Sequence, residues 1–260
     1  MQIELIGCTS AGKSTLARGI LQACREQGLD IFLGEDFVLK QFRLNWIKSH
    51  LLRKLLVNQA ALLASLITWR NNRKLYLFAT QLLFQLPIPQ LERLNLLRNV
   101  LKKIGIHEII RLRRTGQQVI LVDEGVLHIA HNLFVHVSAE VKMEHLAMFA
   151  ELVSLPDVVV YLKQPEELLI NRIIKRGHKR IPDHSYNKVA RFVKQAIVTF
   201  DKLVQHPAVE NKLLVVGNDQ NVQIAANDHG DPVMSLALQI IQSAFTDNTS
   251  CRPAEIIYAE

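Results

Sequence analysis

The segment near the start of the chain constrains its fold more than any other. Residues 7–14 read GCTSAGKS and fit the pattern G-x-x-x-x-G-K-[ST] at every required position. An apolar run at residues 2–6 precedes the segment, and residues 13–27 place apolar side chains at helical spacing. Strand, glycine loop and helix in this order are the context in which the pattern binds phosphate. We therefore expect a nucleotide phosphate site on an α/β sheet.

Each residue type in this loop has a distinct task in phosphate chemistry. The glycines let the backbone N–H groups surround a phosphate, and the following helix points its positive end at the anion. Lys13 is expected to reach the β- and γ-phosphates as a catalytic residue, and the Ser14 hydroxyl to ligate Mg²⁺. ATP and Mg²⁺ are therefore the expected cofactors. The candidate ATP ligands in this loop are Gly7, Thr9, Ser10, Ala11, Gly12, Lys13, Ser14 and Thr15.

An acid at the end of a second apolar run completes the expected metal site. Residues 119–122 read VILV and are followed by Asp123, at the end of the strand where ligands of parallel sheets bind. We expect Asp123 to hold Mg²⁺ together with Ser14 and to act in catalysis. An acid in such a turn can also cap a helix, which is the alternative for Asp123 considered alone.

The order of apolar and helical segments predicts an α/β fold. Five expected strands alternate with helices, which predicts a five-stranded parallel sheet with helices on both faces. Residues 37–114 contain no strand pattern and are expected to form a helical insertion. We expect one domain over residues 1–246, a lid at about 176–184 and a tail at 247–260. The expected strands are residues 2–6, 31–33, 119–122, 158–162 and 212–216.

Three arginines at four-residue intervals precede and enter the expected lid. Arg172 and Arg176 would share one face of a helix, and Gly177 then releases the chain into a loop that contains Arg180. Guanidinium groups suit the negative charge that develops during phosphoryl transfer. We therefore expect Arg172 and Arg176 to be catalytic, with Arg172 also on ATP, and Arg180 to contact substrate. A solvated basic helix end is the alternative.

These motifs resemble one enzyme group, the thymidylate kinases and deoxynucleoside kinases among the nucleoside monophosphate kinase-like enzymes. The resemblance rests on the phosphate loop, the Val-Asp-Glu strand end and the segment PDVVVYLKQPEELLINRIIKRGHKR, within residues 1–36 and 117–245. It implies a P-loop kinase fold, and the segment LLVVGNDQNVQ places Asn218 near the adenine. It also implies that an acid after the second strand takes the acceptor proton, which makes Glu35 the candidate base, with Asp36 and Asp123 as alternatives. The chain departs from the group at Asp123-Glu124-Gly125, where the group carries an arginine.

The basic charge of the chain is concentrated in the expected insertion. The formal net charge is +7, and residues 40–114 contain fifteen Lys and Arg against two acids. This excess favours an anionic acceptor, and the candidate substrate ligands are Glu35, Asp36, Arg43, Glu124, His128 and Arg180. A solvated helical face or contact with a membrane surface are the alternatives. We expect no nucleic-acid partner, because the aromatic residues of this region fall at helical spacings typical of a core. The histidines at 128, 131 and 136 are expected at the surface or lining a pocket rather than on a metal.

Two functions are compatible with these patterns. One is an ATP-dependent kinase that phosphorylates a small molecule, and the other is a regulatory NTPase switch whose basic insertion binds a partner.

The longest uncharged apolar stretch, residues 55–69, is shorter than the about 20 residues of a membrane span. Three scattered cysteines indicate a reducing compartment. We therefore expect a cytoplasmic protein without a transmembrane segment, and a homodimer remains open.

Overall fold

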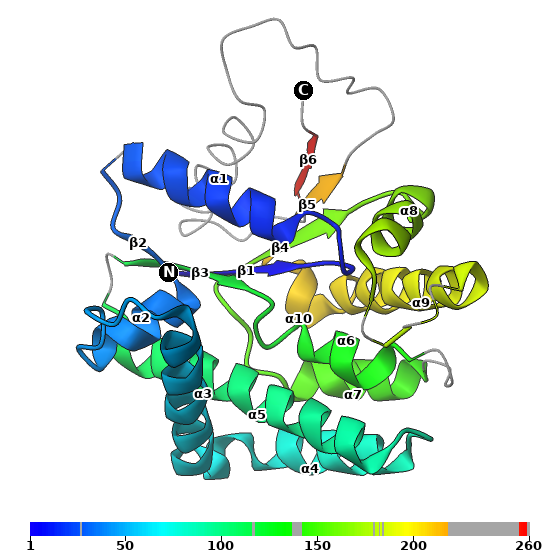
Figure 1. Ribbon diagram of the computed structural model, residues 1–260, viewed down its shortest axis with the longest axis horizontal. Helices are drawn as coiled ribbons and strands as arrows, with labels where there is room; N and C mark the ends of the chain where they lie inside the picture. Colours follow the sequence, from blue (N-terminus) through cyan, green and yellow to red (C-terminus); the bar gives the residue numbers. More distant parts are fainter. Residues whose placement is uncertain are drawn as a thin grey trace, which may run out of the picture.

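A parallel β-sheet forms the centre of the molecule (Figure 1). The computed structural model describes residues 1–26, 28–115, 118–136, 142–178, 180–181, 183, 185–217 and 255–258. Its strand order is β2-β3-β1-β4-β5-β6, and every neighbouring pair is parallel. The strands are β1 (Gln2–Ile6), β2 (Ile31–Leu33), β3 (Val119–Asp123), β4 (Val158–Lys163), β5 (Leu213–Gly217) and β6 (Glu255–Tyr258). The expected α/β fold with a parallel sheet is confirmed.

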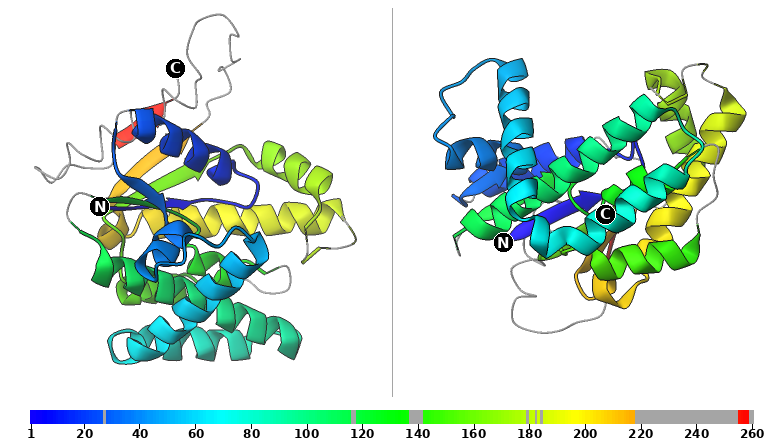
Figure 2. Two further views of the ribbon diagram at one scale, coloured as in Figure 1. Left: turned by 60° about the vertical axis from the view of Figure 1, so that its left-hand side comes forward. Right: turned by 90° about the horizontal axis from the view of Figure 1, so that it is seen from below.

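Helices cover both faces of this sheet, because its strands are apolar on both sides. Ile3 and Leu5 of β1 enter a core with α1 and α8, whereas Ile6 enters a core on the opposite face. Figures 1 and 2 show α1 on one face and α2, α5, α6 and α7 on the other. The helices are α1 (Lys13–Glu26), α2 (Gly34–Gln41), α3 (His50–Ile67), α4 (Trp69–Gln85), α5 (Gln90–Arg113), α6 (Ile129–Phe134), α7 (Met143–Leu152), α8 (Glu166–Arg176), α9 (Tyr186–Val204) and α10 (Pro207–Glu210).

Four helices, α2 to α5, connect β2 to β3 in the region expected to be a helical insertion. α5 lies against the sheet side of this group, and α3 and α4 lie farther out (Figure 1). α3 and α5 pack very closely, because a Cβ atom at Gly105 would lie 1.8 Å from the Ala61 carbonyl oxygen. The buried side chains of α3 are accordingly small or short: Val57, Ala61 and Ser65. The leucines of α3 therefore point mostly away from the core.

The end of the chain differs from the expectation of a tail at residues 247–260. Glu255–Tyr258 forms β6, which pairs in parallel with β5 and adds a sixth strand to the five that the sequence predicts. The sequence also predicts a helix from Pro232 to Phe245, and these residues lie outside the described part of the chain. A strand of four residues is too short to show a periodicity that distinguishes it from a loop, so the sequence does not predict β6. Its pairing with β5 defines it as a strand.

Within the described ranges, no single helix has the length and apolar composition to cross a membrane. The helices α3 and α4 meet that test only when taken together, and the chain bends by 102° between them.

Candidate functional site

The phosphate loop joins β1 to α1 and closes around the Lys13 side chain. Gly7 has a φ of +139°, and a Cβ atom there would lie 2.7 Å from the Leu162 carbonyl oxygen. Only glycine fits a position with this backbone angle and so close a neighbouring strand. The buried Lys13 ammonium group donates hydrogen bonds to the carbonyl oxygens of Gly7 at 3.1 Å and Cys8 at 3.0 Å. The loop thus holds a cation at the amino end of α1.

Ser14 and Asp123 meet at the carboxyl edge of the sheet, as the sequence predicts. β1 and β3 are neighbours with Leu5 opposite Asp123, and the Ser14 hydroxyl donates a 2.7 Å hydrogen bond to Asp123 Oδ2. The other carboxylate oxygen, Oδ1, is buried without a hydrogen-bond partner. One hydroxyl and one carboxylate are oxygen ligands of the kind that Mg²⁺ takes together with substrate phosphates. These residues therefore fit the expected ion, and the described residues contain no cluster of three or more His, Cys, Asp or Glu for a separate metal.

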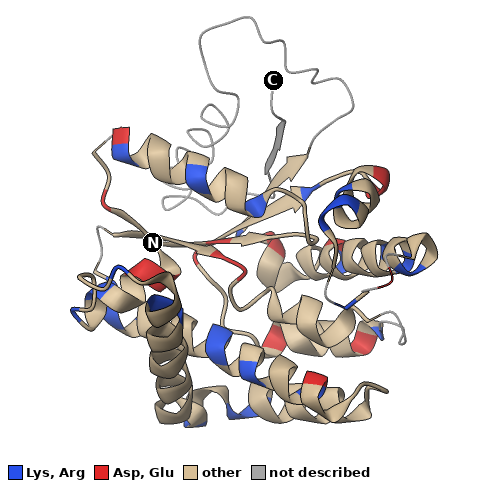
Figure 3. Ribbon diagram, in the orientation of Figure 1, with Lys and Arg blue, Asp and Glu red and all other residues tan. Residues whose placement is uncertain are grey.

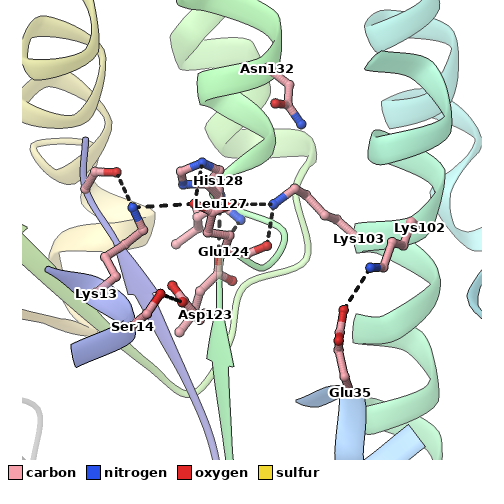
Figure 4. Close-up of polar contacts among 12 residues, drawn as sticks. Lys13, Ser14, Glu35, Lys102, Lys103, Asp123, Glu124, Leu127, His128 and Asn132 are labelled. Atoms are coloured by element: carbon pink, nitrogen blue, oxygen red, sulfur yellow. Dashed lines mark hydrogen bonds and ion pairs between the residues drawn. The ribbon is translucent and has the colours of Figure 1, made fainter. Parts of the chain in front are cut away.

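Glu124 connects the phosphate loop to the insertion (Figure 4). Its Oε1 atom lies 3.6 Å from Lys13 Nζ, and its Oε2 atom lies 3.9 Å from Lys103 Nζ of α5. Lys103 also donates a hydrogen bond to the Glu124 carbonyl oxygen. Burial alone would raise the pKa of Glu124, but the ammonium groups of Lys103 and Lys13 outweigh it and lower that pKa. The ammonium group of Lys103 thus lies beside this strand end, although the chain lacks the arginine that the kinase group carries there.

A buried acid lies directly beneath this strand end. The fully buried Glu4 of β1 accepts hydrogen bonds through Oε1 from the backbone N–H groups of Leu127 at 2.8 Å and His128 at 3.2 Å. Its Oε2 atom has no partner, and burial raises the pKa of Glu4 to about 7. A Cβ atom at Gly125 would lie 2.6 Å from this carboxylate. The Asp-Glu-Gly sequence therefore ends in glycine because the Glu4 carboxylate fills the adjacent space.

A cavity of about 730 Å³ lies between the phosphate loop and the insertion. Ser14 and Asp123 line it on the side of the sheet, and α2, α3 and α5 line it on the other. Lys102 donates a 2.8 Å hydrogen bond to Glu35, and Arg53 donates one of 2.5 Å to Asp36. The charged side chains in the lining are Arg18, Glu35, Asp36, Arg53, Lys54, Lys102, Lys103, Asp123 and Glu124.

The sequence suggested Arg43 as the basic residue of the acceptor site, but other basic residues line this cavity. Three candidate substrate ligands, Glu35, Asp36 and Glu124, line it together with Asp123. Arg43 does not line it, because the residue lies in an exposed turn after α2 with a φ of +56°. The cations are instead residues of α3 and α5, among them Arg53, Lys102 and Lys103. Only the positive charge of the whole region indicated such residues, because no local spacing distinguishes them from solvated lysines and arginines.

The three expected arginines divide into different environments. Arg172 donates a 3.3 Å hydrogen bond from Nη1 to the Ser10 carbonyl oxygen, which places it at the phosphate loop. Arg176 is exposed one turn further along α8. Arg180 does not line the cavity: it donates to the Val135 carbonyl oxygen at 3.2 Å, and its Nε lies 3.9 Å from Glu92 of α5. Of the three arginines, Arg172 is therefore the one that contacts the phosphate loop. Arg180 contacts Val135 and Glu92 instead.

The histidines after Asp123 are core residues, not the surface or pocket-lining residues that the sequence suggested. The rings of His128 and His131 are buried and stacked at 4.9 Å between centroids. Burial lowers the pKa of both well below the usual value, so both are neutral at pH 7. His128 Nε2 lies 3.6 Å from Glu124 but does not line the cavity. His136 is buried too, and its ring Nε2 lies 2.9 Å from the Asn132 carbonyl oxygen.

Asn218, the expected adenine-side residue, lies outside the described part of the chain. No model of a known protein family matches this chain, and no curated protein is significantly similar to it.

Proposed function

We propose that this protein is an ATP-dependent kinase that transfers the γ-phosphoryl group to a small anionic acceptor. The observation that carries the proposal is the 2.7 Å contact between Ser14 and Asp123, which both line the charged cavity. A phosphate loop and a strand-end acid accompany many NTP-dependent activities, but here both open onto a space large enough for a second substrate. A switch that only hydrolyses NTP has no need of such a space.

The residues at the loop have separate roles in this proposal. Lys13 binds the β- and γ-phosphates and leaves its present carbonyl partners to do so. Ser14 and Asp123 hold Mg²⁺, which neutralises phosphate charge when bound. Arg172 reaches the loop from α8 and stabilises charge on the transferring group. Positioning and charge stabilisation are the main protein contributions to phosphoryl transfer.

The acceptor binds in the cavity, with a hydroxyl or phosphate oxygen directed at the γ-phosphate. Glu35 is the candidate base, and Lys102 orients its carboxylate. Lys102 and Arg53 are paired with carboxylates that an anionic group of the acceptor can replace. The cavity therefore favours a nucleotide, sugar phosphate or other anionic metabolite over a neutral acceptor.

The direct test is Mg²⁺-dependent ATP turnover with and without a panel of phosphorylated and carboxylated acceptors. We expect acceptor-dependent ADP formation that Asp123→Asn abolishes. Asp30→Asn is the matched control, because Asp30 precedes β2 at the opposite end of the sheet and is exposed. Slow hydrolysis that no acceptor changes would favour the regulatory switch.

A second assay tests the acceptor side alone. Lys102→Ala and Arg53→Ala should each raise the acceptor KM by about tenfold, the effect of losing one charge-assisted hydrogen bond, and leave the ATP KM nearly unchanged. Lys48→Ala is the control, since Lys48 is an exposed cation of the same region that does not line the cavity. Equal effects of all three substitutions would contradict the assignment of the cavity to the acceptor.

A further inference from the structure

The outer side of α3 carries large apolar side chains that the fold does not cover. The inner side is restricted to small residues by the contact with Gly105, so most of the leucines are turned outward. At the end of the helix, Leu63, Leu66 and Ile67 are 59%, 62% and 82% exposed. Single exposed leucines are ordinary on protein surfaces, but adjacent ones at this exposure indicate a binding surface.

Basic residues follow these apolar residues closely in the sequence. Arg70, Arg73 and Lys74 begin α4 and are all exposed. No Asp or Glu occurs between Asp36 and Glu92, and Figure 3 accordingly shows no acidic segment on α3 or α4. We call residues 63–74 the α3–α4 corner. Figures 1 and 2 place it at the outer edge of the molecule, away from the sheet.

We propose that the α3–α4 corner docks on the surface of an anionic lipid bilayer. Leu63, Leu66 and Ile67 enter the boundary between headgroups and acyl chains, where apolar side chains leave water. Arg70, Arg73 and Lys74 meet the lipid phosphates, at about 1 kcal/mol per basic residue. This inference does not depend on the proposed kinase activity, since it rests on residues outside the cavity.

The geometry of the corner favours docking over crossing. The chain bends by 102° between α3 and α4, and three cations follow the bend within one and a half turns. A corner with apolar residues on one side of a bend and cations on the other fits the interface plane, where both kinds of group find partners.

Charge distinguishes a bilayer from a second copy of the chain. A symmetric dimer formed through the corner would bring two sets of Arg70, Arg73 and Lys74 together, and α3 and α4 contain no acid to pair with them. Like charges at an interface disfavour association. An anionic lipid surface supplies the opposite charge across the whole corner.

Vesicle co-sedimentation of the full chain tests this proposal. We expect binding to phosphatidylcholine vesicles that contain phosphatidylglycerol, little binding to phosphatidylcholine alone, and weaker binding as salt rises. The triple variant Arg70→Ala/Arg73→Ala/Lys74→Ala should bind roughly a hundredfold more weakly, which corresponds to about 3 kcal/mol for three cations. The triple variant Leu63→Ser/Leu66→Ser/Ile67→Ser should lose at least about tenfold.

A matched control tests whether the effect depends on where the exposed apolar side chains lie. Met143 and Met148 are exposed on α7, so Met143→Ser/Met148→Ser should leave binding unchanged. Circular dichroism and thermal unfolding establish that each variant is folded. Trp69 gives a direct signal, because in a Trp46→Phe background it is the sole tryptophan, and its emission should shift to the blue on anionic vesicles.

Results of two kinds, in vesicle binding and in self-association, would overturn the proposal. One is equal vesicle binding by the parent chain and both triple variants, or no binding by the parent chain. The other is a dimer in sedimentation velocity, without lipid, that the serine variant dissociates, since it would assign the corner to a second copy of the chain.

Discussion

Lys13 is paired in this structure with groups that the nucleotide of the proposed function would replace. Its ammonium group donates to two carbonyl oxygens of the loop, those of Gly7 and Cys8, and lies near the Glu124 carboxylate after β3. Under the proposed function, the side chain contributes a charge at the phosphates and little apolar packing. Its removal should therefore affect catalysis far more than stability.

Lys13→Ala should lower ATP turnover by about 10²–10³-fold, the usual effect of removing one charged contact to a transition state. Turnover under saturating ATP and Mg²⁺ measures the loss, and urea unfolding should show a folded protein. Turnover at the parental rate would exclude the phosphate-loop assignment.

Glu4→Gln should make stability less dependent on pH. Glu4 has a raised pKa of about 7 in the folded chain against an ordinary value of 4.5, so the folded chain binds more protons between these values. Stability is therefore greatest below pH 4.5 with respect to this group and falls as pH rises to about 7, by about 3 kcal/mol. Urea unfolding of both proteins at pH 5 and pH 8 measures the change. The free energy of unfolding of the variant should increase relative to that of the parent chain as pH rises. The same pH dependence in both proteins would contradict the raised pKa of Glu4.

At the scale of elements, α3 and α5 pack very closely against each other at Gly105. This packing positions Arg53 of α3 and Lys102 of α5 on the cavity and at the same time turns most leucines of α3 outward. One glycine thus influences both the cavity and the α3–α4 corner.

Gly105→Ala should destabilise the protein by about 3 kcal/mol or more, because the added methyl group would overlap the Ala61 carbonyl oxygen of a rigid helix. Gly217→Ala is the control, since a Cβ atom there meets nothing within 4 Å. Denaturant midpoints compare the two. If Gly105→Ala is as stable as the control, α3 does not pack on α5 as described.

Sequence patterns predict those elements whose signal is local. The phosphate loop, β3 with Asp123, and the strand–helix alternation each lie within a short stretch of chain and were predictable with nearly correct limits. The approach of Lys103 to Glu124, and of Arg53 to Asp36, depends on how helices of the insertion pack on the sheet. Packing of this kind leaves no periodic signal, so the sequence indicated Arg43 and did not indicate Arg53.

At the scale of the whole molecule, β6 brings the end of the chain to the sheet. Its backbone pairs with β5 over Leu214 to Gly217 and thereby covers one edge of that strand. Unpaired strand edges promote association between molecules.

Truncation after residue 254 should therefore lower the thermal midpoint by about 5 °C or more and increase aggregation on heating. Truncation after Tyr258 keeps β6 and is the control. Differential scanning fluorimetry and light scattering measure both effects. Identical behaviour of the two truncated proteins would contradict the pairing of β6 with β5.

The contact between Glu4 and Gly125 links two positions that are far apart in the chain. A side chain at position 125 requires a shorter residue at position 4, and a shorter residue at position 4 leaves the N–H groups of Leu127 and His128 without their acceptor. In related sequences these two positions should therefore covary. A chain that regains a larger residue after its Asp-Glu pair should also have exchanged the acid in its first strand.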